Sequence, residues 1–165
     1  MEQFPRTGFL RRFASWIYDA LAVIAIIMVA EILFLGVIEA LLALDVLVNE
    51  SDKDISEFVQ THAVISVIHQ AYLIICALSF FAYFWCRGGQ TIGMRAWRLK
   101  LQQLDGNRVT PIQAYLRGIC ALGGLGNLLV LVDFKNKRAL QDYIAKTEMI
   151  TLSKEENKRI YQSLD

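Results

Sequence analysis

Residues 13–38 read FASWIYDALAVIAIIMVAEILFLGVI, and this stretch decides the fold class. It holds two charged residues, Asp19 and Glu31, in a run dominated by apolar side chains. A helix that crosses a bilayer needs about 20 mostly apolar residues, so we expect a first membrane helix over 13–38. The apolar pattern continues to Val48. Since a signal peptide has an apolar core of only ~7–15 residues, we expect this helix to be retained.

A second apolar stretch, residues 63–85, meets the same length requirement and is followed by Arg87. Tyr83 and Trp85 lie near its end, and such rings favour the headgroup level of a bilayer. The segment between the two stretches, residues 45–60, is rich in Asp and Glu and has the polarity of a water-exposed loop. The sequence therefore predicts two membrane helices joined by a polar loop.

A third apolar block, residues 112–134, is long enough for one crossing. Gly123 and Gly124 weaken a helix at its middle, because each glycine disfavours helix by about 1 kcal/mol. A helical hairpin that breaks there would have arms of ~15 Å, at 1.5 Å per residue, and would be re-entrant. We favour this hairpin because the basic segment that follows, residues 135–152, is expected on the cytoplasmic side. A third span is the alternative.

The segment 90–110 has a different character. Residues 97–101 alternate between apolar and basic side chains with period two, which favours a strand. Asp105-Gly106 is a common hairpin turn. We expect a short β-hairpin at the cytoplasmic surface, with residues 147–152 able to supply the third strand that a small sheet needs.

The expected fold class is therefore an all-α membrane protein with a small cytoplasmic β-hairpin or sheet. The length of 165 residues suits one domain. We assign residues 1–152 to a single membrane domain and residues 153–165 to a polar tail.

The distribution of Lys and Arg predicts the orientation. Three arginines precede the first helix, five basic residues lie between the second and third blocks, and Lys53 alone lies in the acidic loop. Positive charge is retained on the cytoplasmic side. We expect a multi-pass protein of the bacterial inner (plasma) membrane with a cytoplasmic N-terminus.

Several functional classes find no support in the sequence. A net charge of +1 gives no reason to expect nucleic acid as a partner. His62 and His69 are seven residues apart, whereas helical metal ligands prefer spacings of three or four, so we expect no metal or cofactor. Residues 88–93 lack the Lys-Ser/Thr of a phosphate loop. The three cysteines lie in or beside apolar segments and indicate no disulfide framework: Cys76, Cys86 and Cys120. No nucleophile with an adjacent base is evident, and we expect no enzyme.

Charged side chains inside membrane segments are the strongest functional candidates, because each carries an insertion cost. Asp19 lies seven residues after Arg12, two turns along the same helix face. It is interpreted either as a carboxylate that binds a cation or proton, or as a buried partner of Arg117. Arg117 in turn is either that counter-charge or an arginine that reaches the inner surface. Glu31 lies deeper and ~120° around the helix from Asp19, which argues against one proton path along this helix.

Asp142 lies in the basic segment after the third block. We expect it to cap a helix or to pair with Arg11, Arg12 or Arg138 at the cytoplasmic end.

Three pieces of sequence together resemble the RDD family of bacterial membrane proteins, named for one arginine and two aspartates. They are RFASWIYD at 12–19, GQTIGMR at 89–95 with Asp105-Gly106 after it, and KRALQDYIAKT at 137–147. The resemblance covers roughly residues 6–152 and implies Arg12, Asp19 and Asp142 as signature residues. The chain departs from the family pattern at Gln141, where a histidine is usual, and at Lys146, where a glycine is common.

The resemblance leaves function open, since some members look like sodium/proton antiporters and most have no assigned role. Our first hypothesis is a small cation/proton exchanger that works as a homo-oligomer, with Asp19 binding the ion or proton and Asp142 gating the inner mouth. Arg117 or Arg12 would tune Asp19, and Glu31 would support it. The alternative is a non-transporting accessory or assembly protein that docks a partner through its cytoplasmic face.

Overall fold

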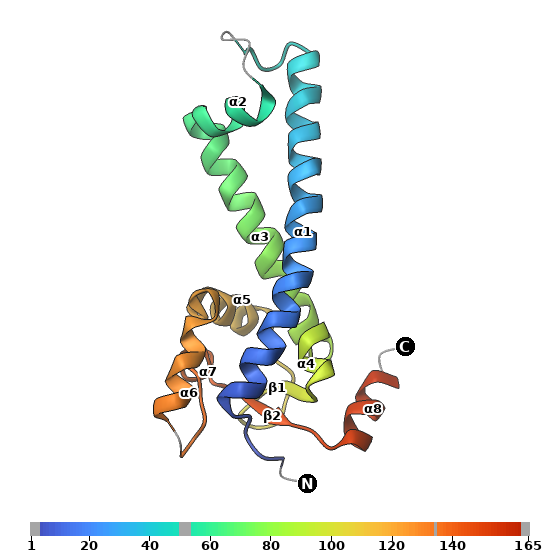
Figure 1. The fold of residues 1–165 in the computed structure, drawn as a ribbon, viewed down its shortest axis with the longest axis vertical. Helices are drawn as coiled ribbons and strands as arrows, with labels where there is room; N and C mark the ends of the chain where they lie inside the picture. Colours follow the sequence, from blue (N-terminus) through green and yellow to red (C-terminus); the bar gives the residue numbers. More distant parts are fainter. Residues whose placement is uncertain (1–3, 50–53, 134, 163–165) are drawn as a thin grey trace. The chain divides into compact units, whose positions relative to one another are not determined.

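The computed structural model describes residues 4–49, 54–133 and 135–162 (Figure 1). The protein is mostly helical, at 69%. It forms two compact units. Unit 1 comprises Met1–Ala22 with Leu78–Asp165, and unit 2 comprises Val23–Ala77. The two long helices each contribute to both units, and each unit is described here by itself.

Helices α1 (Phe9–Ala43) and α3 (Ala63–Arg87) contain the two predicted membrane helices. Their most apolar windows have mean hydropathies of 2.9 and 2.0, and both helices are long enough to cross a bilayer. Large apolar side chains such as Leu21, Ile32 and Val67 are exposed along them. Exposed apolar surface on this scale requires a covering phase, so the prediction of two membrane helices is confirmed.

Unit 2 also contains α2 (Ile55–Thr61), a helix within the segment for which only a polar loop was predicted. Phe58 and Val59 of α2 are buried in a cluster with Ile38 and Ile65. These two side chains form an apolar face, and burying that face stabilises the short helix although the residues around it are acidic. Residues 50–53 of the loop lie outside the described part of the chain.

A two-stranded antiparallel sheet in unit 1 pairs β1 (Leu99–Gln103) with β2 (Thr147–Thr151), with Leu101 opposite Met149. The sheet is confirmed, but the predicted hairpin within residues 90–110 is wrong. Helix α4 (Ile92–Ala96) occupies the first part of that segment. A turn does form at Asp105-Gly106, where Gly106 N–H donates to the Gln103 carbonyl oxygen at 3.0 Å.

The chain then starts helix α5 (Pro111–Cys120) instead of a second strand. Thr110 caps this helix, and its side chain and that of Gln113 satisfy each other's backbone N–H groups. Pro111 follows at the first helical position, where its fixed φ suits a helix. These signals leave too few residues after the turn for a strand, so the partner of β1 comes from residues 147–151.

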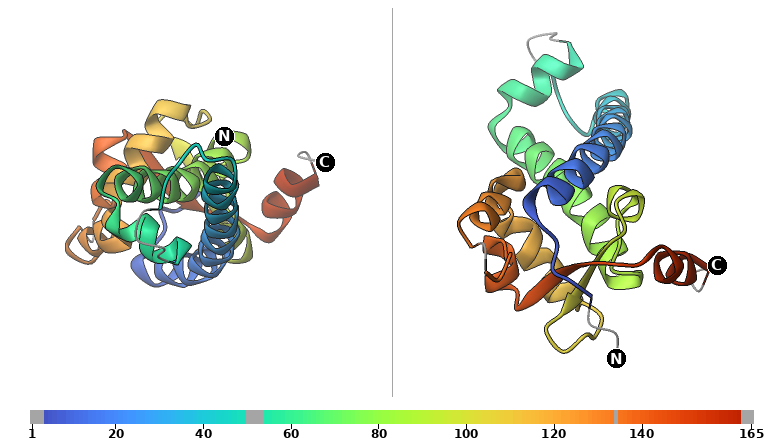
Figure 2. Two further views of the ribbon diagram at one scale, coloured as in Figure 1. Left: turned by 90° about the horizontal axis from the view of Figure 1, so that it is seen from above. Right: turned by 60° about the horizontal axis from the view of Figure 1, so that its bottom comes forward.

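The N-terminal segment adds a third stretch on the other edge of β2. Thr7 N–H donates to the Met149 carbonyl oxygen and Thr151 N–H donates to the Pro5 carbonyl oxygen, each at 2.9 Å. In Figure 2 the blue N-terminal segment runs beside the red strand. This pairing supplies the third stretch of chain that a small sheet needs to be stable.

The third apolar block forms α5, the 3₁₀ helix η1 (Leu122–Leu128) and α6 (Leu129–Val132). The two parts meet at 84°, so the break lies where the glycines predicted it, but the arms do not fold back against each other. Gly123 and Gly124 have φ of 64° and 104°. A Cβ on Gly124 would lie 2.8 Å from Trp16 Nε1, so this glycine also permits close packing on α1.

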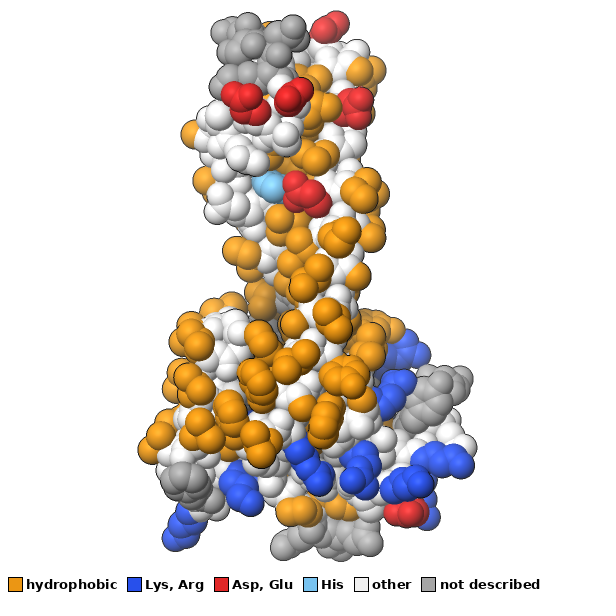
Figure 3. Space-filling view, in the orientation of Figure 1, with side chains coloured by type: hydrophobic (Ala, Val, Ile, Leu, Met, Phe, Trp, Pro, Cys, Tyr) orange, Lys and Arg blue, Asp and Glu red, His pale blue; other side chains and the backbone are white. Residues whose placement is uncertain are grey.

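The pairing of β1 with β2 bears on how the bent block can meet the membrane. β1 precedes this block and β2 follows it, so a single crossing would put two hydrogen-bonded strands on opposite sides of the bilayer. This pairing favours the re-entrant alternative, while the length and composition of the bent pair fit either one broken span or a re-entrant loop. Exposed apolar residues such as Ile112, Leu125 and Val132 give it a surface for lipid. In Figure 3 the hydrophobic side chains of unit 1 form a band, and Lys and Arg gather beneath it.

Two further helices complete unit 1: α7 (Leu140–Ile144) and α8 (Lys154–Gln162). Helix α8 forms within the predicted polar tail. Asn157 holds it to the rest of the unit, because its side chain accepts from Gln90 Nε2 at 2.8 Å and donates to the Arg95 carbonyl oxygen at 3.3 Å.

Candidate functional site

The first cluster of charged side chains surrounds Asp142, in the first turn of α7. One carboxylate oxygen accepts from Arg12 Nη1 at 2.7 Å and from the Ala139 N–H at 2.9 Å. The other oxygen forms a short ion pair with Arg117 Nη1. The Asp142 side chain is 0% exposed, and those of Arg12 and Arg117 are 1% and 2% exposed. Two arginines and one aspartate are thus removed from solvent together.

The two arginines extend this cluster to other elements. Arg12 Nε donates to the Thr7 carbonyl oxygen at 3.2 Å, and its Nη2 donates to the Lys137 carbonyl oxygen at 3.0 Å. Arg117 donates to Thr147 Oγ1 at 2.7 Å, and its guanidinium carbon lies 5.3 Å from the centroid of the Trp85 ring, a cation–π distance. The cluster therefore ties α1, α5 and α7 to β2 and to the end of α3.

The charges around Asp142 decide its protonation state. Burial by itself raises the pKa of a carboxylate. The positive charges of Arg117 and Arg12, with the Ala139 N–H, more than offset this and hold the pKa of Asp142 below its ordinary value. Asp142 is therefore ionised at neutral pH, and the cluster of three side chains carries one net positive charge.

Asp19 forms a separate cluster with neutral donors. Its Oδ2 accepts from Thr91 Oγ1 at 2.6 Å and from Ser15 Oγ at 3.4 Å, and its Oδ1 accepts from the Gly93 N–H at 2.9 Å. The residue is 3% exposed. Thr91 also caps α4, because its Oγ1 accepts from the Met94 N–H at 3.2 Å. Asp19 thus holds the first turn of α4 against α1.

The approach of α4 to α1 depends on Gly93. A Cβ at this position would overlap the backbone oxygen of Ser15 and lie 3.0 Å from the Asp19 carboxylate. Only glycine permits this separation, which explains the second glycine of the GQTIGMR stretch.

The structure brings together three of the five residues singled out in the sequence: Arg12, Arg117 and Asp142. Arg117 pairs with Asp142, so the Arg117–Asp19 pair considered from the sequence is not formed, and Arg117 does not reach the inner surface as a solvated charge. Arg138 donates to the backbone oxygen of Asp142, not to its carboxylate. Arg11 is exposed.

Glu31 lies in unit 2, where its carboxylate contacts His69 Nε2 at 2.7 Å. The Phe34 ring lies 4.7 Å from the His69 ring, centroid to centroid. His62 instead caps the start of α3, where its Nδ1 accepts from the Ile65 N–H at 3.4 Å. Over residues 4–49, 54–133 and 135–162, no group of three or more His, Cys, Asp or Glu side chains could hold a metal ion.

Sequence reasoning missed Thr91 and Gly93 as partners of Asp19, and Thr147 as a partner of Arg117. Thr91 had a usable signal, since threonine favours the position before a helix. Thr147 had none, because its contact with Arg117 depends on pairing between segments far apart in the chain.

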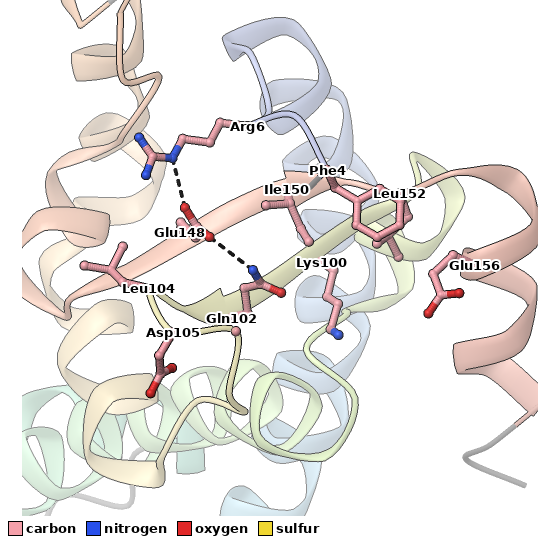
Figure 4. A pocket seen from close by; sticks show the side chains of 11 residues that line it. Phe4, Arg6, Lys100, Gln102, Leu104, Asp105, Glu148, Ile150, Leu152 and Glu156 are labelled. Carbon is pink, nitrogen blue, oxygen red and sulfur yellow. Dashed lines mark hydrogen bonds and ion pairs between the residues drawn. The ribbon is translucent and has the colours of Figure 1, made fainter. Parts of the chain in front are cut away.

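An open pocket lies over the outer face of the sheet (Figure 4). Its volume is about 780 Å³. Lys100 and Gln102 of β1 and Glu148 of β2 point into it, because they alternate with the buried residues of their strands. Glu148 accepts from Arg6 Nε at 2.9 Å and from Gln102 Nε2 at 3.1 Å. The pocket therefore presents both signs of charge.

The sequence matches the RDD family over residues 6–146. The chain belongs to the RDD family. A search of curated proteins finds no match, and a search of solved structures finds none. Arg12, Asp19 and Asp142, the residues that the resemblance implies as the signature, are divided in this structure between two buried clusters. At Gln141, where the RDD pattern usually has histidine, the side chain donates to Asn127 Oδ1 at 2.9 Å and joins α7 to η1.

Proposed function

We propose that this RDD protein is a non-transporting accessory or assembly protein that docks a cytoplasmic partner at the pocket on its sheet. The observation that carries the proposal is a contrast in availability. The signature residues are buried and fully engaged by other groups of the chain, whereas the sheet pocket is open and lined by polar side chains. A residue that binds a ligand from solution must be accessible to that ligand. The side chains of the sheet pocket are accessible, and the buried signature residues are not.

The chemistry of the pocket favours an extended, polar protein segment as its occupant. Arg6 and Lys100 offer positive charge, and Glu148 and Glu156 offer negative charge. Ile150 adds an apolar floor. Complementary charges of both signs fix the register of a bound segment more than they add affinity. We propose no catalytic step at this pocket.

The proposal includes a location and an orientation. We infer an inner-membrane protein with its N-terminus and sheet in the cytoplasm, because Arg87 ends α3, four more basic residues lie between α3 and α5, and acidic residues dominate the segment between α1 and α3. Single cysteines at Asn107 and at Asn49, in a background without the native cysteines, test this. A membrane-impermeant thiol reagent added to intact cells should label the Asn49 position only, and labelling of the Asn107 position alone would reverse the orientation.

Site-specific cross-linking tests the docking proposal. A photoreactive amino acid at Gln102, inside the pocket, should cross-link in cells to one protein species, which mass spectrometry identifies. The same amino acid at exposed Lys158 on α8 is the control. The adduct should disappear when Glu148 is changed to Lys, and the purified partner should bind the wild-type protein directly. Equal cross-linking at Gln102 and Lys158, or no loss with Glu148→Lys, would contradict the proposal.

Cation/proton exchange is a second candidate, supported by two observations. Among the described residues Asp19 has no cationic partner, and the hydroxyls of Ser15 and Thr91 beside it are oxygen ligands of the kind that hard cations accept. Glu31 and His69 form a polar contact at 2.7 Å between α1 and α3, the two helices that are apolar enough to cross a membrane. Two long helices enclose little space, so this function would need a homo-oligomer.

Liposomes separate the two candidates. Purified protein is reconstituted with an internal pH-sensitive dye, and sodium, potassium and proton gradients are imposed in turn. The accessory function predicts no cation-driven proton movement above that of empty liposomes. Movement that Asp19→Asn abolishes, with Asp105→Asn as the control that retains it, would establish exchange and overturn the primary proposal.

A further inference from the structure

A second, smaller pocket in unit 1 is surrounded by positive charge. It has a volume of about 100 Å³ and lies where α3 ends, beside β1 and the turn that follows it. Arg87, Lys100 and Arg108 contribute to its wall from three different elements. None of the residues that line it is acidic, and the remaining wall comes from three glycines, Asn107 and the apolar residues Leu101 and Ile160.

Two of the three cations have no partner in the part of the chain that the structure describes. Neither the Lys100 ammonium nor the Arg108 guanidinium has a hydrogen bond or an ion pair to any described residue. The nearest acid in sequence, Asp105, is occupied by Asn107, whose backbone N–H and Nδ2 donate to it at 3.0 and 2.8 Å. Figure 4 shows Lys100 without any dashed contact. Like charges around one small space repel each other, so an anion between them would stabilise this arrangement.

The backbone keeps the pocket small. Gly89 has a φ of +71°, and a Cβ there would overlap the backbone oxygen of Leu101. Leu101 N–H donates to the Gly89 carbonyl oxygen at 2.7 Å. The end of α3 is thus fixed against β1, and Arg87 and Lys100 are held at the same opening.

The position of Arg87 places the pocket at the boundary of a membrane helix. Arg87 is the last residue of α3, and its guanidinium carbon lies 5.8 Å from the centroid of the Tyr83 ring. Tyrosine favours the headgroup level of a bilayer. The opening therefore lies at the depth where lipid phosphates are found.

We propose that this pocket binds one phosphate group. Arginine matches the fork of phosphate oxygens and lysine adds a point charge, which is a common combination at phosphate sites. The group can come from the headgroup of an anionic lipid or from a soluble phosphate, since both present the same tetrahedral anion. Lys100 lines both pockets, but Arg108 and Arg87 line only this one, so the Arg108 variants test this inference separately from the docking proposal.

Native mass spectrometry of the full chain tests the lipid source. The protein is titrated with phosphatidylglycerol and, separately, with phosphatidylcholine. Wild-type protein should bind one phosphatidylglycerol in preference to phosphatidylcholine. Arg108→Gln and Lys100→Gln should each weaken this binding at least about fivefold, the loss of one charge-assisted contact. Arg108→Lys, which keeps the charge, should retain binding and shows that the position tolerates substitution.

Matched controls and a second arm complete the test. Arg11→Gln and Lys135→Gln remove one exposed positive charge each from elsewhere in unit 1 and should change the affinity by no more than about twofold. In phosphatidylcholine nanodiscs, inorganic phosphate is added against chloride at equal ionic strength, and the unfolding temperature is measured. If phosphate raises the unfolding temperature and the effect requires Arg108, the pocket binds soluble phosphate. If phosphate has no such effect and phosphatidylglycerol binds, the pocket binds a lipid headgroup. Equal losses in controls and pocket variants, or no anion effect in either arm, would overturn the proposal.

Discussion

Asp142 and Asp19 are both buried carboxylates in unit 1, yet the chain satisfies them by different means. Asp142 lies between two arginines, and the whole group is withdrawn from solvent. Asp19 accepts hydrogen bonds from two hydroxyls and one backbone N–H, all of them neutral. In a buried ion pair each charge depends on the other, because removing either side chain leaves the other charge buried and uncompensated. When a carboxylate is held only by neutral donors, as Asp19 is, its removal leaves no uncompensated charge in the interior.

The largest expected effect follows from removing the negative charge at the paired site. Asp142→Asn leaves Arg12 and Arg117 buried without a counter-charge, which costs about 3–5 kcal/mol in comparable buried pairs. We expect most of the folded protein to be lost in detergent, measured by size-exclusion chromatography and by unfolding temperature. Asp105→Asn, the same change at an exposed position, should behave as wild type.

Acid should weaken the same cluster. Because the pKa of Asp142 is lowered in the folded state, its contribution to stability is complete above the ordinary aspartate pKa of about 3.9 and is lost as the pH falls below that value toward the folded-state pKa. Unfolding temperature measured from pH 7 to pH 3 should fall mainly below about pH 4. A fall centred near pH 6 would assign the acid sensitivity to another group.

Gly93→Ala should give the next largest effect, because it separates α4 from α1 beside Asp19. The added Cβ overlaps the Ser15 backbone oxygen, so the helices must move apart. Overpacking of this kind costs about 1–3 kcal/mol. Gly8→Ala is the control, since a Cβ there meets nothing within 4 Å. Thermal unfolding of both variants in one detergent compares them, and equal losses would show that Gly93 is not a packing constraint.

Asp19→Asn should cost less than either change. The amide keeps one acceptor oxygen, and the Thr91 hydroxyl can rotate to accept from the new NH₂ group, so we expect about 1–2 kcal/mol. A double-mutant cycle with Thr91→Ala measures the contact directly. The two effects should be non-additive, and strict additivity would mean that the 2.6 Å hydrogen bond contributes nothing.

Glu31→Gln should have the smallest effect. The Glu31 side chain is 36% exposed, and hydrogen bonds between membrane helices average about 0.6 kcal/mol. Glu39→Gln, at an exposed position of the same helix, is the matched control. An unfolding temperature lowered as far as in Asp142→Asn would place a second essential charge pair in unit 2.

The comparison also shows which features the sequence could predict. The long helices follow from local hydropathy, and the break at Gly123 and Gly124 follows from local backbone preference. The candidate residues were recognisable because charges inside apolar segments are rare. Which aspartate pairs with Arg117 was not predictable, since it depends on the direction that α5 takes after the sheet.

The sheet was predicted only in part, because residues 147–152 were expected as a strand but the neighbour of residues 97–101 was expected within 90–110. Asp105-Gly106 is a sound turn signal, and the turn forms, but Thr110 and Pro111 begin a helix directly afterwards. The partner of β1 then has to come from residues beyond the bent block, a contact that no local pattern encodes. The same non-local pairing favours the re-entrant alternative for the third block over a third span.

Parallel thermal unfolding of Asp142→Asn, Asp19→Asn and Asp105→Asn in one lipid nanodisc tests the central claim most directly. If Asp142 is the charge that holds unit 1 together, the unfolding temperature should fall most for Asp142→Asn, by a smaller amount for Asp19→Asn, and not at all for Asp105→Asn. An Asp142→Asn protein as stable as wild type, or one less affected than Asp19→Asn, would contradict the account.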